Sequence, residues 1–248
     1  MSESKKESKL RRLIKNEGLF GLIRVVNRKL KIKFYKLYNH RPFNNRFSLG
    51  NLKGGGNTLS IGKGTLLKRV KIFVFGKNNK ISIGKMSALT GCAIYVYGND
   101  NTIDIKDDVL VNHGEIVLKN GGNVFTIDNG SKLCGKVHFS CFEGTKISVG
   151  KDCLFSNELV IRTGDAHTVL DLQGNRCNFS KDVTIGDHVW IGSHVIMEKG
   201  SAVADNCIIA SGAVVTKRFE TSNVVIGGVP AGIIKKDINW DRELLLKK

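Results

Sequence analysis

The 248-residue sequence has little of what marks several common protein classes. It holds only two prolines against 28 glycines, and 41% of its residues are hydrophobic, which is not the composition of a disordered chain. No stretch approaches eighteen consecutive apolar residues, so we expect no helix that crosses a bilayer. The opening segment MSESKKESKLRRL lacks the apolar core of a signal peptide. We therefore expect a cytoplasmic protein.

The six cysteines form neither a CxxC pair nor a set with metal-ligand spacing: Cys92, Cys134, Cys141, Cys153, Cys177 and Cys207. We expect reduced thiols and no metal. Aromatic residues make up only 7% of the chain, and no nucleic-acid-binding signature accompanies its basic residues. Nucleic acid is therefore not an expected partner.

Positive charge is abundant and uneven. Of the formal net charge of +17, eleven units lie in residues 1–47, which hold fourteen Lys and Arg against three Asp and Glu. This block favours an anionic partner, either an acidic polymer or a membrane surface. In the second case the protein would bind peripherally at the inner face of the membrane. The alternative is a solvated tail that aids solubility. Its mixture of apolar and basic residues predicts one or two amphipathic helices.

A 22-residue repeat follows this block. It is visible in NTLSIG (57–62), NKISIG (79–84), NTIDIK (101–106), NVFTID (123–128) and TKISVG (145–150). The first two apolar columns are Leu59, Ile81, Ile103, Phe125 and Ile147, and Ile61, Ile83, Ile105, Ile127 and Val149. A small-residue column and a further apolar column follow: Thr65, Ser87, Val109, Ser131 and Cys153, then Leu67, Leu89, Val111, Leu133 and Phe155. Each repeat is thus one coil of a solenoid, and the period-two pairs indicate strands that stack on their equivalents.

From Phe179 the period shortens to six residues, so that three hexads make a triangular coil of eighteen residues. The first position of each hexad is large and apolar: Phe179, Ile185, Ile191, Met197, Val203 and Ile209. The fifth position is small or β-branched: Val183, Val189, Val195, Ser201, Cys207 and Ala213. Glycines such as Gly62 and Gly84 follow the aliphatic residue, where we expect corners that need unusual backbone angles. His138 and Ser140 interrupt the third side of the fourth long repeat, and the sequence does not place its strand.

The hexads, with GDHVWIG and ASGAVVTK, resemble the hexapeptide-repeat acyltransferase family. The resemblance covers residues 48–218 and implies an all-β fold, a left-handed parallel β-helix. Because this fold also hosts zinc-dependent enzymes and nucleotidyltransferase tails, a metal-binding or non-enzymatic scaffold stays open as an alternative. The segment 219–248 is predicted to be a tail with a short helix from near Asn239 or Asp241.

Residues 161–178, IRTGDAHTVLDLQGNRCN, follow neither period, and such a polar excursion from a solenoid commonly carries function. The excursion contains Asp165 and His167. Acyl transfer from a thioester to an alcohol needs a base, and imidazole suits that task near neutral pH. A nearby carboxylate could hold the required tautomer. The alternative is a surface loop whose histidine only caps a turn.

The DAH segment, followed 23 residues after the histidine by Trp190, resembles bacterial capsular and sialic acid O-acetyltransferases. That resemblance implies His167 as general base, Asp165 as its partner and Trp190 as a wall of the acetyl-transfer site. His188 and His194 also occupy outward positions, and we expect both to be solvated. No cysteine neighbours the histidine, so direct transfer is favoured over a covalent intermediate.

A more distant resemblance to galactoside and maltose acetyltransferases implies the residues that bind acetyl-CoA. They are Gly192, Ser193, Ser211, Thr216, Lys217 and Lys235. That family usually has Lys or Arg after the Pro-Ala pair, but Gly232 stands here, so one phosphate contact is missing unless Lys235 or Lys236 supplies it. For Lys217 and Lys235 the alternative is ordinary surface charge.

The sequence therefore predicts an acetyl-CoA-dependent O-acetyltransferase of a bacterial capsular or surface polysaccharide, acidic or neutral. The resemblance implies a homotrimer whose active sites lie between neighbouring solenoids. Acetylation of a small acceptor, such as a free sugar, nucleotide-sugar or antibiotic, is the enzymatic alternative.

Overall fold

The structure, a computed structural model, describes residues 46–50 and 55–244. These residues belong to the second of two units into which the chain divides, Met1–Asn44 and Asn45–Lys248. The predicted basic helical extension over 1–47 lies outside the described residues, except that Arg46 and Phe47 belong to strand β1. Every regular element within the described ranges is a β-strand, and none of their segments is a helix that could span a membrane.

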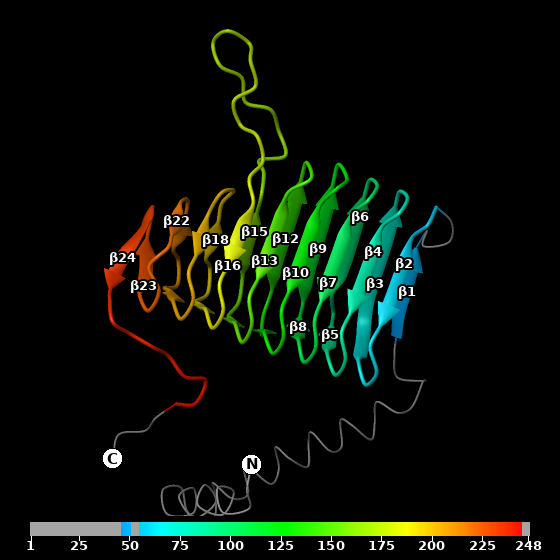
Figure 1. Cartoon of the computed structure of the whole chain (residues 1–248), viewed down its shortest axis with the longest axis horizontal. Helices are drawn as coiled ribbons and strands as arrows, with labels where there is room; N and C mark the ends of the chain where they lie inside the picture. Colours follow the sequence, from blue (N-terminus) through cyan, green and yellow to red (C-terminus); the bar gives the residue numbers. More distant parts are fainter. Residues whose placement is uncertain (1–45, 51–54, 245–248) are drawn as a thin grey trace, which may run out of the picture. The chain divides into compact units, whose positions relative to one another are not determined.

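The strands wind into a parallel β-solenoid whose coils have three sides (Figure 1). The first side is an eight-stranded sheet of β2 (Thr58–Ile61), β4 (Lys80–Ile83), β7 (Thr102–Ile105), β10 (Val124–Ile127), β13 (Lys146–Val149), β16 (Val183–Ile185), β19 (Ala202–Val203) and β22 (Arg218–Phe219). The second side holds β5 (Ala88–Thr90), β8 (Leu110–Asn112), β11 (Lys132–Leu133), β14 (Leu154–Phe155), β17 (Trp190–Ile191), β20 (Ile208–Ile209), β23 (Val225–Gly228) and β24 (Ala231–Lys235). The third side holds β1 (Arg46–Gly50), β6 (Ala93–Tyr97), β9 (Gly114–Lys119), β12 (Val137–Phe142), β15 (Leu159–Arg162), β18 (Ile196–Met197) and β21 (Val214–Val215). The long β3 (Leu66–Phe75) turns the corner between the second and third sides and joins them in one 16-stranded sheet.

The predicted coil lengths are confirmed by the strand register. Along the first side Leu59 pairs with Ile81, and Ile81 with Ile103, a spacing of 22 residues. After the excursion the spacing falls to eighteen, as in the pairing of Trp190 with Ile208. The third-side strand that the sequence left unplaced is β12, where His138 pairs with Glu115 on one neighbour and Val160 on the other.

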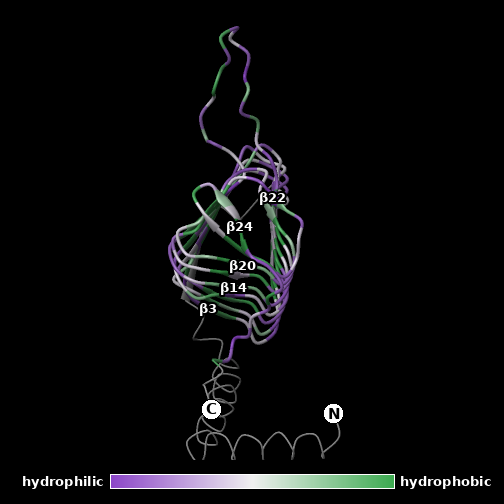
Figure 2. Cartoon of the chain, turned by 90° about the vertical axis from the view of Figure 1, so that its left-hand side faces the viewer, coloured by the Kyte–Doolittle hydropathy of each residue, from purple (hydrophilic) through white to green (hydrophobic). Residues whose placement is uncertain are grey.

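The four predicted columns form the core of the solenoid. Their members are buried, apart from Leu59 and Ile61 in the first coil, where no described strand covers β2 on its outer side. In the small-residue column, hydroxyl groups bond to the next coil: Thr65 Oγ1 donates to the Gly84 carbonyl at 2.6 Å and Ser131 Oγ to the Gly150 carbonyl at 2.7 Å. A hydroxyl therefore fits this buried position because a backbone acceptor lies one strand away. Figure 2 views the coil from its C-terminal end.

The corner glycines are not there for the predicted reason, which was a need for unusual backbone angles. Gly62, Gly84 and Gly192 do not have the positive φ angles found at many other corners. Instead a Cβ on Gly62 would lie 2.5 Å from the Lys85 nitrogen, and one on Gly192 would lie 2.6 Å from Ser211 Oγ. Glycine is needed here because successive coils approach closely.

Two predictions about the ends of the hexad region are also wrong. Phe179 is 60% exposed, so it is not a core position, and the short coils begin at β16 with the buried Val183. The strands continue through β24, and residues 236–244 form no helix. Tertiary contacts attach this segment to the coils: Trp240 stacks on His188, and Arg242 donates to the Cys153 carbonyl at 3.1 Å.

Candidate functional site

The predicted excursion leaves the coil between β15 and β16 and projects well away from it (Figure 1). It is an ordered hairpin, in which Leu170 and Arg176 form an antiparallel bridge and the Cys177 nitrogen donates to the Val169 carbonyl at 3.0 Å. At its tip Asp171 Oδ1 accepts bonds from the backbone nitrogens of Gln173 and Asn175 at 2.9 and 2.8 Å. These local bonds give the excursion a defined shape.

An ion pair fixes the returning strand of the hairpin to the coil below. Arg176 Nη2 lies 2.9 Å from Glu143 Oε2, and Nη1 lies 2.5 Å from Oε1. The same carboxylate accepts bonds from the Ser180 hydroxyl at 2.6 Å and backbone nitrogen at 3.1 Å. The Arg176 guanidinium, and then Ser180, lower the pKa of Glu143 to about 2 because both favour the charged carboxylate.

Asn178 closes the base of the hairpin and is 8% exposed. Its Oδ1 accepts a bond from the Val169 nitrogen at 2.8 Å. Its Nδ2 donates to Asp165 Oδ2 at 2.8 Å and to the His167 carbonyl at 2.7 Å. One amide therefore fixes both predicted catalytic residues, the first through its side chain and the second through its backbone.

Asp165 points toward the coil. Its carboxylate bonds Asn178 and forms an ion pair with Lys199, which follows β18 and also donates to the Asn178 carbonyl at 3.2 Å. Lys199 is the main cause of the lowered pKa of Asp165, followed among the favourable contacts by Asn178. The partners of this carboxylate in the structure are thus Lys199 and Asn178. The resemblance had implied that its partner is the imidazole of His167. Ala166 between the two residues has a φ of 61°, so the chain turns there.

His167 is exposed, and its ring makes no hydrogen bond with any residue that the structure describes. Its backbone is nevertheless fixed through the Asn178 amide. Both ring nitrogens are therefore available to a ligand, while the position of the residue is set by the base of the hairpin.

Trp190 lies on β17 with 38% of its surface exposed, in the outward position that the sequence predicts. Its ring centroid is 6.2 Å from that of Trp240 in the C-terminal segment. Because β17 belongs to the second side and the hairpin leaves the end of the third, Trp190 and His167 lie on different sides of one solenoid.

The expectation for the other two outward histidines is wrong for one of them. His188 packs against Trp240, and its Nδ1 lies 2.8 Å from Asp152 Oδ2. The side chain of His194 is 67% exposed and pairs with Glu158 at 3.0 Å. Among residues 46–50 and 55–244 no group of His, Cys, Asp and Glu side chains could hold a metal ion.

Three of the predicted acetyl-CoA residues meet at one corner, between the second and third sides. Ser211 lies one coil beyond Ser193, and its Oγ accepts a bond from the Ser193 nitrogen at 3.1 Å. Gly192 must lack a side chain because Ser211 Oγ occupies the position that a Cβ would need. The corner therefore presents backbone and hydroxyl groups along which an extended ligand could lie.

The remaining predicted acetyl-CoA residues lie elsewhere. Thr216 and Lys217 are exposed between β21 and β22, at the corner between the third and first sides, and Lys217 Nζ lies 5.5 Å from the centroid of the Phe219 ring. Lys235 is exposed at the end of β24, which pairs antiparallel with β23. Gly232 has open space where a Cβ would point. The third side thus separates Lys217 from the corner that holds Ser193 and Ser211.

Sequence reasoning missed the residues that organise the hairpin. Lys199 is 34 residues from Asp165 and sits in an ordinary-looking hexad, so only the stacking of coils reveals the pair. Asn178 carried one usable signal: it is the last residue of the aperiodic segment, where a hairpin must close.

Known proteins resemble the chain over most of its length. Residues 182–217 match the bacterial transferase hexapeptide (six repeats) family. A polysialic acid O-acetyltransferase of Neisseria meningitidis is 35% identical over 193 residues, which cover 77% of this chain and 89% of that protein. A polysialic acid O-acetyltransferase of Escherichia coli O1:K1 is 30% identical over 56% of this chain, and there the match spans only 42% of the relative.

A solved structure agrees with the sequence comparison. A crystallographically analysed polysialic acid O-acetyltransferase superposes with a TM-score of 0.77 and 32% identity, covering 82% of this chain and 95% of the other. The shared part therefore includes the solenoid and is not restricted to the hexads.

Proposed function

The chain belongs to the acetyl-CoA-dependent hexapeptide-repeat O-acetyltransferases, and on that premise we propose that it acetylates a hydroxyl group of polysialic acid or a related anionic capsular polysaccharide. The observation that carries the proposal is the relative of Neisseria meningitidis, matched at 35% identity over 89% of its length. We also propose that the solenoid winds in the left-handed sense that is typical of hexapeptide repeats.

His167 is the proposed general base. Its exposed ring has no hydrogen-bonding partner among the described residues, so a nitrogen is free to accept the proton of an acceptor hydroxyl. The acceptor oxygen then forms a bond to the thioester carbonyl carbon while the carbon–sulfur bond breaks. The imidazolium returns the proton to the departing CoA thiolate, so the reaction yields an O-acetyl ester and CoA thiol.

Asp165 is proposed to act as a positioning residue. Its carboxylate is engaged by Lys199 and Asn178, and Asn178 in turn fixes the His167 backbone. Since the pKa of Asp165 is lowered by these partners, the carboxylate stays charged at neutral pH and the ion pair persists. Asp165 would thus hold the loop that presents the base.

Acetyl-CoA is proposed to lie along the last coils, with its extended arm at Gly192, Ser193 and Ser211. The exposed Lys217, Thr216 and Lys235 would contact its phosphate and adenosine end. The meeting of Gly192, Ser193 and Ser211 at one coil corner, where Ser211 is exposed, supports this assignment.

We also propose that the active unit is a homotrimer. His167 and Trp190 come from different sides of the solenoid, so a cleft that contains both needs a neighbouring copy. Val169, Leu170 and Leu172 on the projecting hairpin are half-exposed or more, with Leu172 at 101%, and they would be covered by that copy.

Incubation with acetyl-CoA and polysialic acid tests the proposal. Mass spectrometry of the polymer after depolymerisation should show added acetyl groups, and release of free CoA thiol should match their number. A neutral polysaccharide incubated in parallel should gain few. Thiol release without acetylated sugar would leave only thioester hydrolysis and would contradict the proposed acceptor.

A further inference from the structure

Four aromatic rings form a cluster on the outer face of the third side, in the first and second coils. Phe73 stacks on Tyr95 with ring centroids 5.6 Å apart, and Phe75 stacks on Tyr97 at 5.2 Å. The two ring planes within each stack differ by 6° and 5°. Since the rings on one strand are also nearly parallel, at 9° for Phe73 and Phe75, the four make one aromatic platform.

The platform is accessible to solvent. Phe75 is 42% and Tyr97 is 39% exposed, in a chain whose aromatic residues are few. Neither tyrosine hydroxyl donates or accepts a hydrogen bond within the residues that the structure describes. Contiguous exposed aromatic groups on a folded protein usually mark a binding surface.

Basic side chains flank the platform, and two exposed acidic ones lie near it: Asp100, three residues after Tyr97, and Glu115, which pairs with Ala93 on the adjacent strand. Residues 55–99 contain seven Lys and Arg and not a single Asp or Glu. All seven basic residues are exposed: Lys63, Lys68, Arg69, Lys71, Lys77, Lys80 and Lys85. Lys71 alternates with Phe73 and Phe75 on the outward face of β3, and Lys77 follows the strand at the corner. Lys71 and Lys77 are thus the cations nearest the rings along the chain, whereas Lys63 and Lys85 lie at the corner between the first and second sides.

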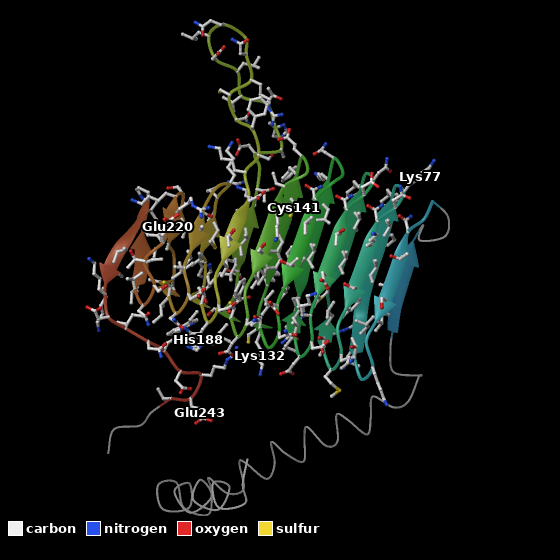
Figure 3. All side chains as sticks on the ribbon, viewed as in Figure 1. Lys77, Lys132, Cys141, His188, Glu220 and Glu243 are labelled. Carbon is white, nitrogen blue, oxygen red and sulfur yellow. The ribbon has the colours of Figure 1, made fainter. Side chains whose placement is uncertain are left out.

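The platform shares a side of the coil with the base of the catalytic hairpin. The strands run in the order β3, β6, β9, β12 and β15, and the hairpin follows β15 (Figure 1). From β6 to β15 there are three strand spacings, about 14 Å at the usual separation of about 4.8 Å. Lys77 also lies at the edge of the coil from which the hairpin rises (Figure 3).

We propose that the platform of Phe73, Phe75, Tyr95 and Tyr97, with Lys71 and Lys77, is a second binding subsite for an anionic polysaccharide chain whose distal sugar residues are acetylated near His167. The inference rests on the proposed function for the acceptor class. Aromatic rings pack against the C–H faces of sugar rings, free phenolic hydroxyls bond sugar hydroxyls, and lysines pair with carboxylates. A surface for an apolar protein segment would need neither the lysines nor the open hydroxyls.

Binding and catalysis can be measured separately on the full chain. The variant Phe75→Ser with Tyr97→Ser removes the two most exposed rings, and Lys71→Ala with Lys77→Ala removes the two cations. Matched controls come from the same coils but the opposite corner: Met86→Ser, which is also 42% exposed, and Lys63→Ala with Lys85→Ala. Each protein is titrated with long polysialic acid without acetyl-CoA, and acetylation of long chains and of a sialic acid dimer is then compared.

Both platform variants should weaken binding of the long polymer at least about tenfold, about 1.4 kcal/mol, while acetylation of the dimer stays within about twofold of wild type. The controls should bind as wild type does. Unchanged polymer affinity in the platform variants would overturn the inference. A changed oligomeric state in the ring variant, with normal affinity in the lysine variant, would overturn it too and make the platform a contact between copies.

The two proposals fail in different ways. If wild type binds polysialic acid through the platform but acetylates no sugar, the proposed function falls and the subsite stands. If wild type acetylates both substrates and the platform variants bind and acetylate long chains normally, the subsite falls and the function stands.

Discussion

The rings of His188 and Trp240 stack with centroids 4.2 Å apart and planes 10° apart, although 52 residues separate them in sequence. Trp240 Nε1 also donates to the His188 carbonyl at 2.8 Å, and His188 Nε2 lies 3.1 Å from the Trp240 carbonyl. The C-terminal segment is thereby attached to the coil that carries Trp190. This attachment links the tail to one wall of the proposed site.

Replacing Trp240 with Ala should detach this segment. Trp240 is 8% exposed, so the change removes nearly all of its packing and the indole bond to the His188 carbonyl, and we expect a loss of about 3 kcal/mol in unfolding free energy. Chemical denaturation measures the loss, and trypsin should cut faster after Arg242. The exposed Leu244→Ala serves as the control. Equal stability and equal cleavage of the two variants would contradict the attachment.

The ion pair of Glu143 with Arg176 predicts a pH dependence. The pKa of Glu143 falls from 4.5 to about 2 on folding, so its stabilising contribution is complete above about pH 4.5 and is lost as the pH falls toward 2. The difference in unfolding free energy between wild type and Glu143→Gln should therefore shrink over that range. Glu220→Gln, at an exposed carboxylate, should show a smaller difference at neutral pH. A difference that is constant from pH 7 to 2 would contradict the assigned role.

Asn178 should control turnover without controlling acetyl-CoA binding. Asn178→Ala removes the bonds to Asp165 and to the His167 backbone, and displacement of a base by about 1 Å can lower the rate by about 100-fold. Acetyl-CoA affinity should stay near wild type because the proposed cofactor residues lie on later coils. Asn175→Ala, at the hairpin tip, is the matched control. If both variants lose affinity and rate equally, the effect is general unfolding of the loop.

The core columns make the strongest structural prediction. Ile105→Asp places an unpaired charge at a position with no solvent exposure, flanked by Ile83 and Ile127 on the adjacent strands, at a cost of several kcal/mol. Soluble expression and the far-ultraviolet circular dichroism spectrum should both be lost. The outward neighbour Asp104→Asn should fold normally. A stable, folded Ile105→Asp protein would show that the column does not form the core.

The sequence predicts the solenoid because every coil must satisfy the same local constraint. Ile81, Ile103 and Phe125 occupy one stacked position, and a 22-residue period is visible without any tertiary information. The tail was less predictable. The segment near Asp241 has a helix-like composition, but its described residues are not helical. Trp240 and Arg242 bind distant coils instead, and no local sequence pattern records such contacts.

The candidate site was also predictable only in part. Asp165 and His167 stand out because they interrupt a strict period, and the structure places both on one hairpin. Their immediate partners could not be inferred, since Lys199 meets Asp165 only through coil stacking. The turn at Ala166, which separates the directions of the two side chains, leaves no mark in a three-residue motif.

Turnover of His167→Ala with polysialic acid and acetyl-CoA tests the account most directly. Loss of the general base should lower turnover by about 10²–10⁴-fold, while acetyl-CoA affinity measured by calorimetry stays near that of wild type. His194→Ala removes an imidazole that is 67% exposed and distant from the hairpin, and it should turn over normally. Turnover of His167→Ala equal to that of wild type would contradict the account, because the exposed ring on the hairpin would then have no part in the reaction.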